Sequence, residues 1–220
     1  MKVNKDFALL YGIMLGDGCL SLINKKRKFL VISSCFYDDM DFVKSIISPL
    51  LEKLIGNRVN FKLRPKNGVI EFNFINSILF DFISSFGFPI GKKGIELEIP
   101  SVFYKKRLLK YVVKGYFATD GSLVFTKNPN LLYPRLEASS ISKKLMEQIC
   151  KFFNDNGIKC NLYLRKSKNW KWNQQYRIQS NGKVNLRLFN QKIGFLNPKH
   201  YRKFEGFMAA LGVEPRTPSS

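Results

Sequence analysis

The chain of 220 residues has very little histidine and cysteine. His200 is its only histidine, and its four cysteines form no Cys-x-x-Cys pair. A nuclease site centred on histidine, or a zinc cluster of His and Cys, is therefore not expected. Cys19, Cys35, Cys150 and Cys160 fall in apolar or strand-like segments. This placement predicts reduced, small core residues in an intracellular protein of the cytoplasm, the nucleoid or an organelle matrix.

Acidic residues are also scarce. The chain has 16 Asp and Glu against 37 Lys and Arg, a formal net charge of +21. Residues 101–220 carry 23 basic and 6 acidic residues, hence +17, whereas residues 1–100 carry 14 and 10, hence +4. Such an excess predicts a polyanionic partner. No apolar run is long enough to span a membrane and no signal-peptide pattern opens the chain, so nucleic acid is favoured over a membrane surface.

Two segments of the same design organise the sequence. Residues 9–18 read LLYGIMLGDG and residues 112–121 read VVKGYFATDG. In each, an apolar segment carries a glycine, and an aspartate followed by glycine comes five positions later. The two aspartates, Asp17 and Asp120, are 103 positions apart (120 − 17). A lone Asp-Gly pair is most often a hairpin turn, but its repetition with the same upstream glycine indicates a duplicated element.

Each segment predicts a buried helix that ends near its aspartate. Gly12 and Gly16 are four apart and share one helix face, and Gly115 and Thr119 mark the matching face of the second segment. Small residues on one face allow another helix to approach closely, so we expect the two helices to pack side by side. Gly18 is expected to take a left-handed cap conformation. Because an aspartate in the last turn faces the negative end of the helix dipole, a positive group should lie there.

Packing of these helices would bring Asp17 and Asp120 together. Two carboxylates at close range repel each other and disturb each other's protonation unless a cation lies between them. The pair therefore predicts ligands for a hard divalent metal.

These residues resemble the LAGLIDADG homing endonucleases, whose named motif aligns with residues 10–18 and 113–121. The resemblance covers nearly the whole chain, including residues 87–100, which are similar to the linker of single-chain members, where a Gly-Lys-Lys run precedes an Ile-Pro pair. It implies an α+β fold of two pseudo-symmetric αββαββα domains, with antiparallel sheets forming a DNA-binding saddle and the motif helices packed at the interface. The domains would be residues 1–94 and 95–212, with a tail at 213–220.

The resemblance implies a site-specific endonuclease that cuts double-stranded DNA at a long, asymmetric target as a monomer, in the service of intron homing. Asp17 and Asp120 would bind Mg²⁺ ions, which would activate a water and stabilise the developing charge. The backbone carbonyls of Gly16 and Thr119 would add metal ligands.

One departure from the family pattern concerns the basic residue near each metal. Family members usually hold a lysine there, often with a glutamine, but residues 33–36 contain no base. In the second half Lys143 is a candidate for tuning the water, and a surface position in the first turn of a helix is an equally good interpretation. A non-cleaving protein stays open as an alternative, either an intron maturase that grips RNA or a DNA-binding regulator.

The coarse pattern predicts helix, strand, strand, helix, strand, strand, helix, twice over. In the first half an alternating segment at residues 58–64 would turn its apolar set toward the core and its polar set outward. Arg and Lys on such a face read guanine and Asn reads adenine, although an ordinary solvated face is the alternative. The helix that comes before this segment contains Pro49, which predicts a kink in it. The candidate DNA-binding residues are Lys25, Lys26, Arg27, Lys28, Arg58, Asn60, Lys62, Arg64, Arg135, Arg165, Lys166, Lys168, Gln175, Arg177 and Gln179.

Overall fold

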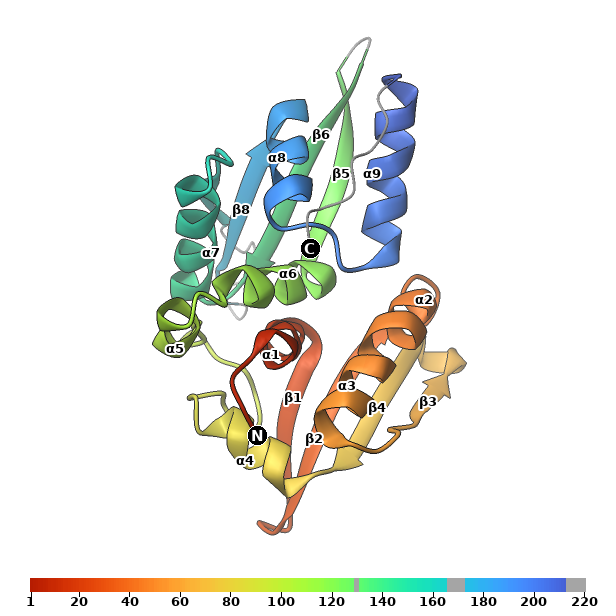
Figure 1. Ribbon diagram of the computed structural model, residues 1–220, viewed down its shortest axis with the longest axis vertical. Helices are drawn as coiled ribbons and strands as arrows, with labels where there is room; N and C mark the ends of the chain where they lie inside the picture. The colour runs from red at the N-terminus through yellow and green to blue at the C-terminus, as the bar shows by residue number, and fades with distance from the viewer. Residues whose placement is uncertain (129–130, 166–172, 213–220) are drawn as a thin grey trace. The chain divides into compact units, whose positions relative to one another are not determined.

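The computed structural model describes residues 1–128, 131–165 and 173–212. Two compact units form, each with its own four-stranded antiparallel sheet (Figure 1). Unit 1 comprises Met1–Lys93, Pro100–Thr119 and Leu196–Lys199, and unit 2 comprises the rest of the chain. Within the described ranges, none of the helices has the length and apolar character needed to cross a membrane.

Unit 1 contains both motif helices. Its elements in chain order are α1 (Lys5–Asp17), β1 (Gly18–Ile23), β2 (Arg27–Cys35), α2 (Met40–Phe42), the π-helical turn η1 (Val43–Ile47), α3 (Ser48–Ile55), β3 (Phe61–Arg64), the 3₁₀ turn η2 (Pro65–Asn67), β4 (Val69–Ile75), α4 (Ser77–Ser84), α5 (Ser101–Lys105) and α6 (Leu109–Thr119). The strand order is β1-β2-β4-β3, with all neighbours antiparallel. On β2 and β4 alternate side chains are buried, and α1 and α4 pack against β2.

The core of unit 1 is rich in aromatic residues around α1. Phe7 meets Phe82 edge-on with ring centroids 4.6 Å apart, and Tyr11 lies 4.9 Å from Phe103. Phe103 comes from the short helix α5, which the sequence pattern did not predict. A helix buried on nearly all sides, as α1 is from Phe7 to Leu15, is held by this packing more than by its own helix propensity.

The predicted kink at Pro49 takes the form of a wide helical turn. The helix continues from Met40 to Ile55, and η1 ends at Ile47, two residues before Pro49. Proline lacks an N–H group and its ring crowds the carbonyl four residues earlier, here that of Ser45, so a wider turn relieves the clash. Gly56, with φ 81°, ends the helix in the left-handed conformation.

Unit 2 repeats the strand order of unit 1. Its elements are β5 (Gly121–Asn128), β6 (Leu131–Ser140), α7 (Lys143–Asp155), β7 (Asn161–Arg165), β8 (Gln175–Asn181), α8 (Lys183–Lys192) and α9 (Pro198–Ala210), the first turn of α9 being counted with unit 1. The sheet order is β5-β6-β8-β7, and α7 and α8 pack against it. Ser142 caps the start of α7, since its side chain accepts a hydrogen bond from the N–H of Leu145.

The predicted α+β class and the repeated element order are confirmed, with α5 and α9 as additions. Three local predictions are wrong. Gly18 is extended (φ −90°, ψ 158°) because the chain enters β1 directly, and the glycine serves close approach, since a Cβ there would lie 2.8 Å from the carbonyl oxygen of Met14. Leu63 is 49% exposed because β3 is a short edge strand, and Cys35 is exposed at the end of β2.

Candidate metal centre and nucleic-acid interface

The two motif helices cross at their glycines. A Cβ on Gly12 would overlap the carbonyl oxygen of Val112 and lie 2.8 Å from the backbone nitrogen of Tyr116. A Cβ on Gly115 would overlap the carbonyl oxygen of Leu9 and lie 3.0 Å from the backbone nitrogen of Ile13. The predicted contact between α1 and α6 is therefore confirmed at both glycines, and it is a backbone-to-backbone contact that no other residue would permit without a shift.

The two glycines contact equivalent backbone atoms of the opposite helix. Leu9 corresponds to Val112 and Gly12 to Gly115 at the same offset of 103 (112 − 9 and 115 − 12). Each helix thus presents its glycine to the equivalent backbone atom of the other, which is the arrangement of a two-fold axis. Asp17 and Asp120 each follow five residues after the crossing glycine.

The end of α1 holds the positive group that the sequence predicted. The Lys93 ammonium donates to the carbonyl oxygens of Met14 at 3.3 Å and Leu15 at 3.0 Å, and also to that of Gly16. No basic residue lies in the last turn of α1 itself. Lys93 therefore supplies, from far along the chain, the charge that offsets the negative end of the helix dipole.

Asp17 is the last residue of α1 and is half-buried. The Ser34 hydroxyl donates to its Oδ2 at 3.5 Å. Residues 33–36 thus contribute a hydroxyl, where the family pattern suggested a base.

The end of α6 is built differently. The Asn197 side-chain amide donates to the Ala118 carbonyl at 3.0 Å and to Asp39 Oδ1 at 2.8 Å. Lys199 pairs with the same carboxyl oxygen at 2.7 Å. Ala118 is the counterpart of Leu15 at the offset of 103 (118 − 15), so a neutral amide stands where α1 has an ammonium. Asn197 is 1% exposed and Asp39 6% exposed, which makes this a buried, fixed arrangement.

The atoms at these helix ends that could bind a metal ion are all oxygens. Oxygen donors suit a hard cation such as Mg²⁺ and suit zinc poorly. In the part of the chain that the structure describes, no group of three or more His, Cys, Asp or Glu side chains could hold a metal. One carboxylate per helix end still fits Mg²⁺, which keeps several waters and takes further ligands from substrate phosphates. The Gly16 carbonyl has a second lone pair beside the one that Lys93 binds.

The predicted DNA-binding residues of the first half include residues of an exposed turn and residues held in ion pairs. Lys25 and Lys26 form the exposed turn between β1 and β2, which Arg27 begins to close. Lys28 is held by Asp81 at 2.6 Å, and Arg64 is held by Glu71 at 2.8 Å.

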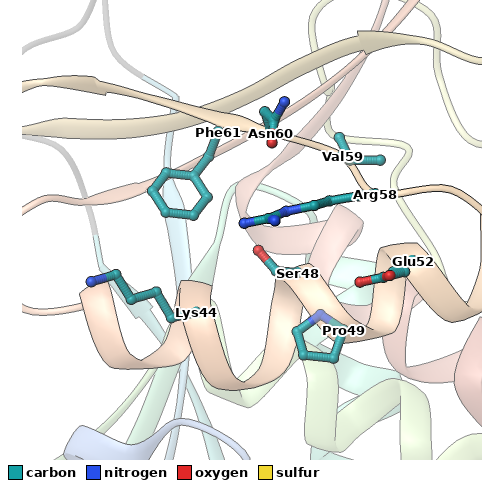
Figure 2. Close-up of a pocket in the computed structure, with 8 residues that line it drawn as sticks. All are labelled: Lys44, Ser48, Pro49, Glu52, Arg58, Val59, Asn60 and Phe61. Carbon is teal, nitrogen blue, oxygen red and sulfur yellow. The ribbon is translucent and has the colours of Figure 1, made fainter.

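Arg58 and Asn60 do not belong to the predicted strand, because β3 starts only at Phe61. With Phe61 and α3 they line a hollow of about 550 Å³. Figure 2 shows the Arg58 side chain extended across Ser48. The prediction that Arg58 shares a sheet face with Lys62 and Arg64 is therefore wrong in its strand boundary.

In unit 2 the predicted residues gather around one glutamate. Glu137 Oε2 pairs with Arg135 at 3.1 Å and with Arg177 at 3.8 Å, and accepts a hydrogen bond from Gln179 at 3.5 Å. Gln175 lies in register with Arg165 on the neighbouring strand, and both are exposed.

Two groups of predictions have a different outcome. Lys166 and Lys168 lie outside the described residues. Lys143 lies in the first turn of α7 and pairs with Glu147, one turn on, at 3.1 Å. This geometry favours the helix-surface interpretation of Lys143.

Lys93 and Asn197 are the site residues that sequence reasoning missed. Lys93 lies in a Gly-Lys-Lys run that looked like a linker, and the signal available was the unsatisfied need for a cation near Asp17. Lys114 of α6 is a further, half-buried cation. Burial, and secondarily the charge of Lys110, lowers the pKa of Lys114 below its ordinary value.

Comparison with known proteins gives a consistent picture. Residues 108–194 match the LAGLIDADG-like domain. Over 183 residues the chain is 23% identical to an uncharacterized protein of Methanocaldococcus jannaschii, covering 78% of this chain and 62% of that one. The chain therefore spans about six-tenths of the length of this relative.

Three solved structures are similar across most of the chain. The homing endonuclease I-DmoI in complex with DNA and calcium gives a TM-score of 0.60 at 19% identity, covering 94% of this chain and 97% of that chain. The LAGLIDADG meganuclease I-AabMI, bound to uncleaved DNA, gives 0.59 at 12% identity, covering 97% and 94%. I-SmaMI, bound to its uncleaved DNA target in the presence of calcium ions, gives 0.59 at 11%, covering 96% and 91%. At these identities the likeness establishes the fold.

Proposed function

We propose that this chain is a member of the LAGLIDADG family and a site-specific endonuclease that cuts both strands of DNA with a divalent metal, a proposal supported by its fold and by the match of residues 108–194 to the LAGLIDADG-like domain. We propose further that the metal is Mg²⁺, that one chain binds the whole target, and that the enzyme serves intron homing.

The repeated contact between α1 and α6 carries this proposal. The contact relates Gly12 to Gly115 by a two-fold arrangement, and each aspartate follows its glycine by five residues. The two strands of a DNA duplex are themselves related by local two-fold axes. One aspartate at the end of each crossing helix, half-buried Asp17 on α1 and exposed Asp120 just after α6, therefore suits one scissile phosphate on each strand.

Asp17 and Asp120 are assigned as the metal-holding carboxylates, with the carbonyls of Gly16 and Thr119 as further oxygen donors. When bound, a divalent metal polarises the scissile phosphate and lowers the pKa of a coordinated water. Ser34, which donates to Asp17, keeps that carboxylate oriented.

Lys93 has a part of its own at the first site. Its ammonium binds the carbonyl of Gly16, the residue before Asp17, so we expect its charge to stabilise negative charge that develops on a phosphate bound beside Asp17. At the second site the fixed Asn197 amide offers dipoles and no charge. The chain therefore supplies unequal electrostatic support to the two strands.

The cationic surface supports DNA as the substrate. The net charge of +21 provides phosphate contacts, and the exposed Lys25, Lys26 and Arg27 surround the turn of the first hairpin. In unit 2 the open sheet face offers Arg177 and Gln179, which carry the groups that read base edges in the major groove.

The test is a cleavage selection on the full chain. A duplex pool randomised over a long window is incubated with the chain in Mg²⁺, and molecules cut in both strands are recovered and sequenced. The expected outcome is one long, asymmetric consensus, cut in Mg²⁺ and bound without cutting in Ca²⁺. Binding of a consensus with no cutting in Mg²⁺ or Mn²⁺ would identify a DNA-binding regulator, and a preference for intron RNA over every duplex would identify a maturase.

A further inference from the structure

The two sheets present open faces of different chemistry. On the first sheet, the face that lies between the buried side chains of β1, β2 and β4 carries the apolar residues Ile23, Phe29, Val31 and Ile75, which we call the apolar patch. Ser21, Glu71 and Asn73 lie on the same face. Ile23 is 47% and Ile75 56% exposed, and Phe29 and Val31 are half-buried. Phe29 lies directly opposite Ile75 in the strand register, so the patch is continuous from β2 to β4.

The same positions of the second sheet are polar. The registers superimpose because Ile32 pairs with Gly18 and Phe72, just as Ala138 pairs with Gly121 and Ile178. On this basis the counterparts of Ile23, Phe29, Val31 and Ile75 are Thr126, Arg135, Glu137 and Asn181. Every apolar side chain of the patch is thus replaced by one that forms hydrogen bonds.

Resting on the proposed function, we propose that the apolar patch reads thymine methyl groups in the major groove of one half-site, and that the second sheet reads its half-site through hydrogen bonds. In the major groove the C5 methyl of thymine is the one apolar feature of the base edges, and apolar side chains recognise it by contact. An exposed apolar patch marks an interaction surface rather than an ordinary solvated face.

Charge identifies the occupant of the patch as DNA. Ile23 is followed at once by the turn that carries Lys25 and Lys26, and Arg27 lies opposite Ile23 in the register. A flanking row of cations suits a phosphate backbone on either side of a groove. A second copy of this chain would bring the same cations against each other, so self-association is disfavoured.

The expected effect follows from the loss of one methyl at a time. Replacing a contacted thymine by deoxyuridine removes the C5 methyl and leaves the hydrogen-bonding edge unchanged. Binding should weaken roughly fourfold for each contacted thymine, the factor that burial of one methylene is worth. The same replacement in the other half-site should leave affinity within about twofold, because the counterparts of the patch residues in the second sheet form hydrogen bonds in place of methyl contacts.

The experiment uses the full chain in Ca²⁺ and the consensus duplex from the cleavage selection, with deoxyuridine placed in one half-site or the other. Val31→Thr and Ile75→Thr are the test variants, since threonine keeps strand propensity and places a hydroxyl in the patch. Val124→Thr, on the open face of the second sheet, is the matched control. The test variants should lose the preference for thymine over deoxyuridine in the first half-site, and the control should keep it.

Two results would overturn the inference. One is sequence-specific binding with equal affinity for thymine and deoxyuridine in both half-sites, which would leave the endonuclease proposal standing. The other is a concentration-dependent dimer, seen by light scattering, that Ile75→Thr dissociates, which would make the patch a contact between copies of the chain. Failure to bind any duplex selectively would instead contradict the proposed function itself.

Discussion

Alanine substitution at the helix crossing should give opposite results at two glycines that look alike in sequence. Gly12 and Gly206 both lie inside helices, but a Cβ at Gly12 would overlap backbone of α6, whereas a Cβ at Gly206 in α9 would meet nothing within 4 Å. Alanine is favoured over glycine in a helix interior by about 0.5–1 kcal/mol. Gly206→Ala should therefore stabilise the chain by that amount.

At Gly12 the stability that alanine adds over glycine is smaller than the cost of the steric clash it causes. The atoms that a Cβ would strike are the carbonyl of Val112 and the nitrogen of Tyr116, which are backbone and cannot rotate away. Forced overpacking costs about 1–3 kcal/mol and rises with side-chain size, so Gly12→Leu should be worse than Gly12→Ala. For a chain of this length 1 kcal/mol shifts the melting temperature by roughly 2–4 °C, so calorimetry resolves both signs.

The symmetry of the crossing adds a second measurement. Gly115→Ala should cost about as much as Gly12→Ala, because the two glycines meet equivalent atoms. Once one Cβ has separated the helices, the second finds room, so the double variant should cost less than the sum of the two single variants. Unchanged stability for Gly12→Ala, or strict additivity of the two changes, would refute the close helix crossing.

Three further predictions concern charged groups. Asp17→Asn and Asp120→Asn should each abolish cleavage in Mg²⁺ while gel-shift affinity in Ca²⁺ survives, and full cutting by either variant would remove the metal assignment. Lys93→Met should reduce cutting and lower stability by about 0.3–1 kcal/mol, since a helix end loses its cation, whereas the exposed Lys92→Met should not. The folded-state pKa of Lys114 lies below its unfolded value of 10.5, so the unfolded chain holds that proton more tightly and stability should rise as pH increases toward 10.5. Urea unfolding should show Lys114→Met losing this rise, and an identical pH profile in the variant would contradict it.

The sequence predicted those features of the structure that depend on a short local pattern. The spacing of Gly12 and Gly115 predicted a helix contact, and the alternation along the strands predicted two sheets. The need for a cation at the end of α1 could also be deduced from the dipole. That it would be Lys93 could not, because its contact with Leu15 joins residues 78 positions apart.

Other features depend on tertiary packing that no single segment encodes. The alternation from Arg58 to Arg64 predicts a strand, but the first residues of that segment lie over α3 and only Phe61–Arg64 pairs with β4. The contrast between the sheet faces was present in the composition of the strands, yet it requires the register to show which residues correspond. The sequence-based division at residue 94 stays a prediction, since the compact units interleave along the chain.

The two halves of the sequence share the glycines of the helix crossing but differ on their open sheet faces, and this difference has a physical cause. At the helix crossing α1 and α6 pack against each other, so a side chain added at either glycine must be accommodated by the backbone of the other helix. The open sheet faces have no such mutual constraint, because each would meet only its own half of a target. Val31 and Glu137 can therefore differ while Gly12 and Gly115 cannot. Divergence of the open faces, with the helix crossing kept, suits a chain that reads an asymmetric sequence.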